Sequence, residues 1–352
     1  MIKLSIITIN YNDAEGLRKT LASVAAQTYA NIQHVIVDGG STDGSVEIIR
    51  EYADNQAKGE SLEAKGTEYG EADTPASTLY TLHSTPTEIS TTIYTNLHNS
   101  TPPTHCVCWI SEKDTGIYNA MNKGIRMATG DYIQILNSGD ILTAPDVTER
   151  MMAALLEVKG YRLEVKGSEN GEADTPASRL SPLASRLENC PAIFYGNMTK
   201  VNAAGQVIGK SGYTEYSLRQ FYSSTLNHDC AYIRKDLFEE YGLYDENMKI
   251  VSDWKWYLQA IGVGRVKPEY VDIDVTIFDA GGISETNLEL RNKERRQVLE
   301  EMLPPAVLWD YDQHAFEMEQ MNRLRRWKLY PLVYFMERVC FKLEKWFGFR
   351  RK

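Results

Sequence analysis

The stretch Leu4-Ser-Ile-Ile-Thr-Ile-Asn-Tyr-Asn-Asp13 decides the fold, because a short apolar run in it ends abruptly in polar residues. Leu4 to Ile9 is typical of a buried strand. Asp13 can cap a helix that runs to about Gln27, whose apolar residues recur at helical spacing. A second buried strand follows at Gln33 to Val37. Strand, helix and strand in this order predict two parallel strands joined by a right-handed crossover.

The same pattern repeats along the chain. A polar, glycine-rich turn, Asp38-Gly-Gly-Ser-Thr-Asp-Gly-Ser45, leads into a further helix. Strands are expected at Cys106 to Ser111 and Tyr132 to Leu136, with a helix at Ile117 to Met127 between them. We therefore expect an α/β fold with a mostly parallel central sheet flanked by helices.

Composition and charge narrow the class of protein. The chain has 352 residues, of which 43% are hydrophobic and 24% charged, so it can bury an ample core in one large domain or two smaller ones. Its formal charge of −10 argues against a generally basic surface for nucleic acid. The five cysteines show no metal-binding spacing. No secretory signal or run of about 18 apolar residues is present, so the chain is predicted to be cytoplasmic.

Two similar segments interrupt the pattern. Leu62 to Ser77 reappears almost unchanged as Leu163 to Ser178, and both copies are small, polar and rich in glycine, serine, threonine and glutamate. Such a composition cannot bury enough apolar surface to offset the ordering of the chain. We interpret the two copies as parts of inserted surface loops at about 56–103 and 159–189, although a binding role stays open.

Four polar clusters follow the predicted strands and mark a candidate site. They are Thr8 to Asn12, Asp38 to Ser41, Glu112 to Gly116 and Asn137 to Asp140. Ligands of open parallel sheets bind beyond the carboxyl ends of the strands, so these clusters are expected to converge there. An acidic site can accept a nucleotide diphosphate when a divalent cation is present. Mg²⁺ or Mn²⁺ prefers oxygen ligands, and Asp140 is placed to supply one.

These clusters carry a resemblance to a known family. Ser-Ile-Ile-Thr-Ile-Asn-Tyr-Asn, Val-Asp-Gly-Gly-Ser-Thr-Asp-Gly-Ser and the run from Ser111 to Asp140 resemble family 2 glycosyltransferases of the GT-A fold, in particular bacterial enzymes of exopolysaccharide and O-antigen assembly. The resemblance spans about 1–54, 104–150 and 192–286. It implies a GT-A domain over 1–290, with a donor half at about 1–150, an acceptor half at about 192–290, and a helical extension at 291–352.

The resemblance also implies roles for individual residues. Asp38 would contact the uracil or other base, Asp114 the nucleotide sugar, and Asp140 the metal. The remaining residues expected to bind the nucleotide sugar are Thr8, Asn10, Asn12, Gly39 and Ser41. Family members usually carry an acidic pair such as Asp-x-Asp at the metal motif, whereas this chain has Asn137-Ser-Gly-Asp140.

The second half supplies a candidate catalytic base. Ser252-Asp-Trp-Lys-Trp256 resembles the acceptor half of the family, and Asp253 falls where the family places its base. Inverting transfer needs such a base, because an acceptor hydroxyl that attacks the anomeric carbon must lose its proton. The alternative for Asp253 is a helix N-cap. His228 is expected to contact the acceptor or the diphosphate, or else to be a structural imidazole.

Three further features have two interpretations each. Trp254 and Trp256 either stack on sugar rings or pack in the core. Phe278 to Ser284 resembles a flexible loop that closes near the diphosphate, with a simple turn as the alternative.

The last thirty residues, 323–352, hold ten lysines and arginines and two acids. From Leu329 to Phe347 apolar residues recur at spacings of three and four, and Pro331 is expected in a first helical turn or between two helices. A basic helix with tryptophan and phenylalanine on its apolar side suits an anionic membrane surface. The alternatives are docking on the protein's own acidic body or in a homodimer.

Together these observations predict an inverting glycosyltransferase. It would move a sugar from a nucleotide-diphosphate sugar, with UDP favoured, to a hydroxyl of a surface polysaccharide or lipid-linked acceptor at the inner face of the cytoplasmic membrane. One alternative is a sugar-phosphate nucleotidyltransferase, which has a similar fold. The other is a non-catalytic, membrane-associated scaffold that binds a nucleotide sugar.

Overall fold

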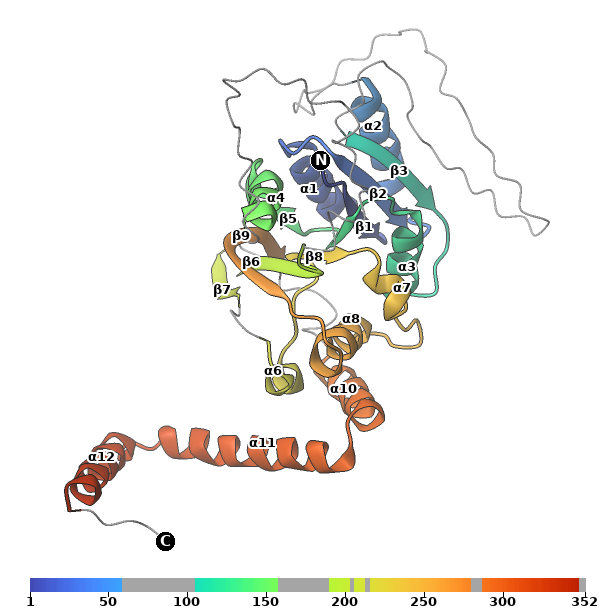
Figure 1. Ribbon diagram of the computed structural model, residues 1–352. Helices are drawn as coiled ribbons and strands as arrows, with labels where there is room; N and C mark the ends of the chain where they lie inside the picture. The colour runs from blue at the N-terminus through green and yellow to red at the C-terminus, as the bar shows by residue number, and fades with distance from the viewer. Residues whose placement is uncertain (59–104, 158–189, 203–205, 213–215, 280–286, 348–352) are drawn as a thin grey trace, which may run out of the picture. The chain divides into compact units, whose positions relative to one another are not determined.

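The computed structural model describes residues 1–58, 105–157, 190–202, 206–212, 216–279 and 287–347 (Figure 1). The expected inserted loops at 56–103 and 159–189 lie almost wholly outside these residues, and so does most of the expected loop at 278–284. The chain divides into two compact units, Met1–Arg295 and Arg296–Lys352.

The first unit begins with four parallel strands, as the sequence predicts. They are β1 (Leu4–Asn10), β2 (Ile32–Asp38), β3 (His105–Ser111) and β4 (Tyr132–Asn137). β1 pairs with β2 on one side and β4 on the other, and β2 pairs with β3, all in parallel. The strand order therefore reverses at β1, and ligands of open sheets bind at such a reversal.

Helices between these strands cover both faces of the sheet. They are α1 (Ala14–Ala25), α2 (Ser45–Lys58) and α3 (Ile117–Met127). Asp13 caps α1, as predicted, by accepting a hydrogen bond from the Gly16 amide at 2.9 Å. α1 and α2 share a core cluster with Ile36 and Val107. α3 packs on the other face, where Gly124 approaches Ile7 so closely that a Cβ would lie 2.4 Å from its side chain.

The second half extends the same sheet with antiparallel strands. β8 (Ala231–Arg234) lies between β4 and β6 (Ile193–Val201) and is antiparallel to both. The remaining strands are β9 (Glu269–Asp279), which is parallel to β6, β5 (Ile141–Leu142) on the far side of β9, and β7 (Val207–Ser211) on β6. The helices of this half are α4 (Val147–Glu157), α6 (Leu218–Ser223), α7 (Leu237–Glu240), α8 (Ser252–Tyr257) and the π-helical segment Leu258–Val263.

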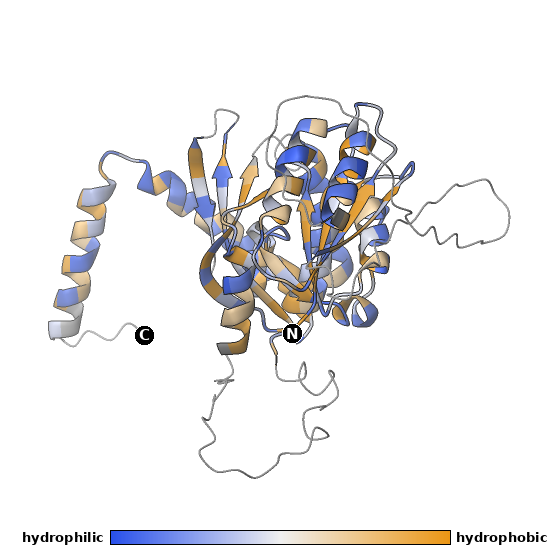
Figure 2. Ribbon diagram, turned by 90° about the horizontal axis from the view of Figure 1, so that it is seen from above, coloured by the Kyte–Doolittle hydropathy of each residue, from blue (hydrophilic) through white to orange (hydrophobic). Residues whose placement is uncertain are grey.

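One aromatic cluster joins the two halves of the sheet. The ring of Phe194 on β6 lies 5.2 Å from that of Tyr132 on β4 and 4.7 Å from that of Tyr232 on β8, measured between centroids. All three side chains are almost wholly buried. The strands around them are largely hydrophobic (Figure 2), so the sheet forms one continuous core across both halves.

Helices form the end of the chain. α10 (Leu288–Met302) begins in the first unit, and α11 (Pro305–Arg325) and α12 (Tyr330–Phe347) follow in the second. Pro331 is the second residue of α12, in the first turn as predicted, where a proline costs no hydrogen bond. Among the described helices none is long and apolar enough to cross a membrane.

A histidine inside the sheet makes stability depend on pH. His34 on β2 is fully buried, and its ring nitrogens hydrogen-bond with Thr8 Oγ1 at 2.9 Å and Tyr52 Oη at 2.8 Å. Burial, with a smaller contribution from His105, lowers the pKa of His34 from 6.5 to about 3. The folded state therefore holds His34 neutral at pH values where the unfolded chain binds a proton.

We expect this neutral histidine to destabilise the protein as the pH falls. Stability from His34 is fully present above pH 6.5 and is lost progressively towards pH 3, because only the unfolded state takes up the proton in that window. Denaturant unfolding of wild type and His34→Gln at several pH values measures the effect. The variant should show a shallower pH dependence by about one proton near pH 5. Equal slopes would contradict the assigned protonation state.

Candidate active site

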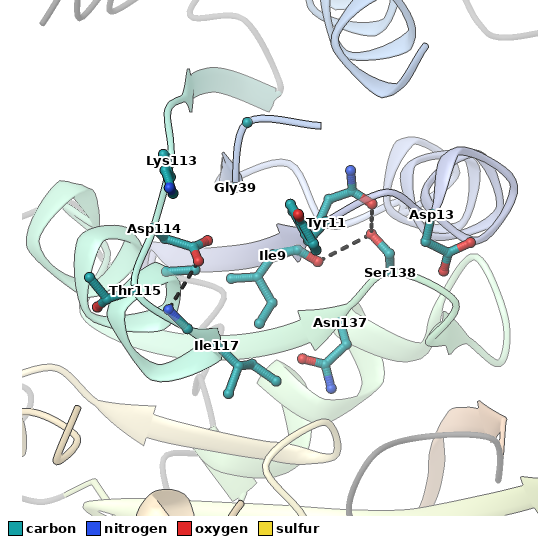
Figure 3. Close-up of a pocket in the computed structure, with 14 residues that line it drawn as sticks. Ile9, Tyr11, Asp13, Gly39, Lys113, Asp114, Thr115, Ile117, Asn137 and Ser138 are labelled. Carbon is teal, nitrogen blue, oxygen red and sulfur yellow. Dashed lines mark hydrogen bonds between the residues drawn. The ribbon is translucent and has the colours of Figure 1, made fainter. Parts of the chain in front are cut away.

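A cavity of about 660 Å³ lies at the carboxyl ends of β1, β2, β3 and β4, where the strand order reverses (Figure 3). All four polar clusters found in the sequence contribute to its wall. The lining residues are Ile9, Asn10, Tyr11, Asp13, Gly39, Gly40, Lys113, Asp114, Thr115, Gly116, Ile117, Ala120, Asn137 and Ser138. The predicted convergence at this edge of the sheet is therefore present, and we name this space the donor cavity.

Asp38 organises the turn beside the donor cavity. Its carboxylate is fully buried and accepts hydrogen bonds from Asn10 Nδ2 at 2.8 Å, Ser111 Oγ at 2.7 Å and Ser41 Oγ at 2.6 Å. The backbone amides of Gly40 and Ser41 also donate to it. Asp38 itself is not among the lining residues, so its visible role is to hold Gly39 and Gly40 in place, and the predicted contact with a base stays a prediction.

The asparagines at the end of β1 tie neighbouring turns together. Asn10 lines the donor cavity, and its Oδ1 accepts a hydrogen bond from Ser138 Oγ at 2.8 Å. Asn12 adopts a positive φ of 50° and accepts from the Thr42 amide, while its own amide donates to Ser41 Oγ at 2.8 Å. Asn12 and Ser41 thus shape the rim of the donor cavity without lining it.

Thr8 lies elsewhere than the resemblance implies. Its side chain is fully buried and bonded to His34, inside the sheet rather than on the wall of the donor cavity. Successive residues of a strand point to opposite faces, and Thr8 lies on the face that α1 and α2 cover. The expectation that Thr8 lines the nucleotide pocket is therefore wrong for this structure.

Asp114 stands on the wall of the donor cavity opposite Asn137 (Figure 3). Its Oδ1 accepts a hydrogen bond from the Gly116 amide at 3.1 Å. Burial and the nearby charge of Asp38 raise the pKa of Asp114, although that hydrogen bond and Lys123 lower it. Gly39 makes room for this carboxylate, since a Cβ there would lie 2.6 Å from Asp114 Oδ2.

Asp140 closes the turn after β4. Its carboxylate is buried and accepts a hydrogen bond from the Asn137 amide at 2.8 Å. Burial first, and then the charge of Asp229, raise the pKa of Asp140 well above that of an ordinary carboxyl group. Asn137 Oδ1 is also buried and has no hydrogen-bond partner among the described residues. One buried oxygen without a partner, Asn137 Oδ1, thus lies in the same short turn as the Asp140 carboxylate.

A second cavity of about 330 Å³ contains the predicted base. Asp253 and His228 both line it, together with Asp229 and a group of polar and basic residues from β6, β7 and α10. His228 Nδ1 donates a hydrogen bond to the Ile135 carbonyl oxygen at 3.2 Å. Burial alone would lower the pKa of His228, but Asp253, Asp229 and Asp140 raise it above its ordinary value. Asp140 and Asp253 therefore act on the same imidazole.

Tyr118 connects the two cavities. Its hydroxyl donates a hydrogen bond to Asp253 Oδ1 at 2.9 Å. Tyr118 lies at the start of α3, directly after Gly116 and Ile117 of the donor cavity. Burial, reinforced by Asp253, raises the pKa of Tyr118 well above its usual value, so the phenol stays a hydrogen-bond donor. Asp253 is not a helix N-cap, because Val251 occupies that position in α8.

Both tryptophans of the acceptor motif belong to the core. Trp254 and Trp256 are exposed by only 1% and 2%, and their indole nitrogens donate to the carbonyl oxygens of Phe221 and Gly242. The core interpretation is therefore confirmed. Sequence reasoning missed Arg291 and Arg295 at the second cavity and Tyr118 beside Asp253, because no local pattern marks these contacts.

A cavity at the reversal of strand order and a second cavity with a carboxylate and a histidine are features of an enzyme that acts on two substrates. The model of the family described as "Glycosyl transferase family 2" matches residues 5–64. An uncharacterized glycosyltransferase of Mycobacterium tuberculosis is 26% identical over 283 residues, which cover 80% of this chain and 76% of the relative. A PGL/p-HBAD biosynthesis glycosyltransferase of Mycobacterium bovis is 22% identical, with 80% and 79% covered.

One of two similar solved structures supports the α/β fold. TarS of S. aureus, residues 1–349 in complex with UDP-GlcNAc, superposes with a TM-score of 0.51 at 14% identity, covering 85% of this chain and 64% of TarS. The mannosyltransferase PcManGT of Pyrobaculum calidifontis, in complex with GDP-Man and Mn²⁺, gives a TM-score of 0.46 at 14% identity, with 84% and 61% covered.

Residues 5–64 therefore match glycosyl transferase family 2, and over 80% of its length the chain is similar to glycosyltransferases. These similarities favour glycosyl transfer over the two alternatives, a sugar-phosphate nucleotidyltransferase and a scaffold without catalytic activity.

The close approach of Gly39 to Asp114 yields a test of the donor cavity. In Gly39→Ala the new Cβ must displace the Asp114 carboxylate, because 2.6 Å is shorter than any ordinary contact. We expect UDP to bind about tenfold more weakly, since one displaced contact is worth roughly 1.4 kcal/mol. Isothermal titration of UDP measures this. Gly209→Ala, whose Cβ would meet nothing within 4 Å, is the control, and unchanged affinity in Gly39→Ala would contradict the role of Asp114.

Proposed function

We propose that this protein transfers a sugar, with inversion at the anomeric carbon, from a UDP-sugar in the donor cavity to a hydroxyl of an acceptor in the second cavity. The observation that carries this proposal is the hydrogen bond from Tyr118 to Asp253, which joins the wall of one cavity to the candidate base of the other. UDP is the first nucleotide to test, because the structural relative TarS is solved with UDP-GlcNAc.

Asp253 would act as the general base. A carboxylate at the acceptor takes the proton from the attacking hydroxyl, which reaches the anomeric carbon from the face opposite the leaving diphosphate. Its half-buried position on the second cavity is the place from which a base can reach an acceptor. Direct attack by a hydroxyl that one base deprotonates, without a covalent intermediate, inverts the configuration at the anomeric carbon.

Tyr118 would position that base. A neutral phenol that donates a hydrogen bond to Oδ1 of Asp253 holds the carboxylate in a fixed position. The carboxylate can still take the proton from the acceptor hydroxyl. Glu246, which accepts hydrogen bonds from Asn119 and Asn122 on α3, anchors the same helix to the acceptor half. The position of α3 therefore sets the distance between the wall of the donor cavity and Asp253.

Removal of the base should abolish transfer and spare donor binding. In Asp253→Asn we expect kcat to fall by about 10²-fold or more, the usual contribution of a general base. The dissociation constant of UDP should stay within a factor of about two, because Asp253 does not line the donor cavity. Transfer from a panel of UDP-sugars and titration of UDP measure the two effects. A variant that keeps wild-type turnover would refute the assignment of the base.

The turn at Asp140 fits a divalent cation, although the described residues contain no group of three or more histidines, cysteines or carboxylates that could hold one. The Asp140 carboxylate and the unpartnered Asn137 Oδ1 are oxygen ligands, which Mg²⁺ and Mn²⁺ prefer, and both ions complete their shell with water and substrate phosphates. Such an ion would neutralise charge on the departing diphosphate. The carboxylate and amide oxygen would hold it in place.

Metal dependence can be read from nucleotide binding. We expect Mn²⁺ to tighten UDP binding to the wild type by about tenfold and to have little effect on Asp140→Asn, because the carboxylate supplies the charge that holds the ion. Titrations of UDP with Mn²⁺ and with EDTA make the comparison. Asp146→Asn, an exposed carboxylate on the same segment, is the control. Equal affinities with and without Mn²⁺ in the wild type would end the metal proposal.

The last helix supports an acceptor linked to a lipid. On α12 large apolar side chains lie exposed, including Phe335 at 65%, Phe341 at 68% and Trp346 at 84%. The segment 323–352 that contains α12 carries a net charge of +8, from ten basic and two acidic residues. Apolar rings beside lysines and arginines bind the interface of an anionic bilayer. The enzyme would then meet a surface-polysaccharide or lipid-linked acceptor at the inner face of the membrane.

Vesicle flotation tests the membrane proposal. The full chain should float with vesicles that contain anionic lipid and should be released at high salt, because screening weakens the attraction. A chain without residues 323–352 should stay at the bottom of the gradient. Vesicles of neutral phosphatidylcholine are the control. A full chain that does not bind anionic vesicles and is dimeric in solution would contradict this proposal. The apolar side of α12 would then be interpreted as the contact with a second copy.

A further inference from the structure

The second cavity contains three basic side chains beside its two carboxylates. Arg291, Arg295 and Lys200 line it, and so do Asp229, Asp253 and His228. The two arginines are four residues apart on α10, so they lie on one face of the helix. Like charges at this spacing destabilise a helix, which is a cost that an anion bound between them would offset.

Arg295 keeps hydrogen-bonding capacity for a ligand, although it stacks on Trp254 and lies near the charge of Asp253. Its guanidinium carbon lies 5.1 Å from the ring centre of the buried Trp254. Its Nε is buried and has no hydrogen-bond partner in the described part of the chain. Arginine stays protonated under all ordinary conditions, and a buried donor without a partner is costly. The guanidinium can form planar, paired hydrogen bonds with a carboxylate or a phosphate.

The helix that carries both arginines is fixed in position. Glu294, between them in sequence, is exposed by only 7%, and its carboxylate accepts hydrogen bonds from the backbone amides of Lys249 at 2.8 Å and Ile250 at 3.0 Å. Those residues directly precede α8, which carries Asp253 (Figure 1). The arginines and the candidate base are thus held against one another by a buried contact, and an anion at the arginines would be placed at a set distance from the base.

We propose that the acceptor of this enzyme is an acidic saccharide, whose phosphate or carboxylate binds Arg291 and Arg295 while a hydroxyl of the same molecule faces Asp253. This inference rests on the proposed function, since it names the substrate class of the second cavity. Ser211 and Asn227, which line the same cavity and bond to each other at 2.7 Å, suit the remaining hydroxyls of a sugar. No residue is shared with the lining of the donor cavity, which favours an acceptor anion over the donor diphosphate.

The test compares charged and neutral sugars of the same shape. In the presence of UDP, dissociation constants are measured by NMR titration for glucose 6-phosphate and glucose, and for methyl β-glucuronide and methyl β-glucoside. We expect the charged member of at least one pair to bind about tenfold more tightly to the full-length wild type. In Arg295→Gln and in Arg291→Gln this ratio should fall to about two or less.

The controls separate the possible failures. Arg296→Gln removes an exposed arginine that pairs with Glu300 and Asp312 instead of facing the cavity, and it should leave the ratio unchanged. If the cavity arginines serve the donor diphosphate, UDP affinity falls in Arg295→Gln and the sugar ratio does not, which overturns the proposal. Equal binding of charged and neutral sugars to the wild type also overturns it. Absence of transfer activity in the wild type would refute the proposed function. The preference for charged over neutral sugars could still be measured by binding, so the two failures are distinguishable.

Discussion

One hydrogen bond of 2.9 Å, from the Tyr118 hydroxyl to the Asp253 carboxylate, connects α3, beside the donor cavity, to the candidate base in the second cavity. Tyr118 belongs to the first turn of α3, whose preceding loop forms the wall of the donor cavity, and Asp253 belongs to α8 on the acceptor side. Inverting transfer needs a base at a fixed place relative to the anomeric carbon. Because Tyr118 is buried and Asp253 lies on a helix anchored by the buried Trp254 and Trp256, the position of the candidate base relative to α3 is set by packing.

A second constraint keeps the donor wall open. Asp38 gathers five hydrogen bonds from three turns, and this network holds Gly39 and Gly40 at the cavity. A glycine is needed at position 39 because Asp114 lies so close, and Gly40 adopts a φ of 81° that favours glycine. The turn thus leaves room for the Asp114 carboxylate at the cavity wall, and the hydrogen bonds of the buried Asp38 hold the turn in this conformation.

The sequence predicted the fold and the donor side well for physical reasons. Apolar runs that end in polar clusters define parallel strands and their carboxyl edge, so Asn10, Gly39 and Asp114 could be placed at one site from local patterns alone. Thr8 was expected on the cavity wall but lies inside the sheet. In a strand, side chains alternate between the two faces of the sheet. β1 is buried on both faces, so its sequence shows no alternation of polar and apolar residues that would reveal which face Thr8 takes. The predictions of membrane binding, dimerisation and metal binding stay predictions, because they concern partners outside the chain itself.

The acceptor side could be predicted only in part. Asp253 was found through its motif. The arginines of α10 line the second cavity, and Tyr118 bonds to Asp253, through contacts between residues far apart in sequence. Tyr118 and Asp253 are separated by 135 positions, and nothing in the local composition of either segment marks the pair. Such contacts depend on how β8 and α8 dock on the first four strands, which is a property of the whole core.

The interaction that matters most can be measured by a double-mutant cycle on kcat with Tyr118→Phe, Asp253→Asn and the combined variant. If the phenol acts only by positioning the carboxylate, its removal slows the wild-type background clearly and has no further effect once Asp253 is an amide. Independent, multiplicative losses in the two backgrounds would show that the tyrosine and the carboxylate act separately, and would contradict the account given for this site.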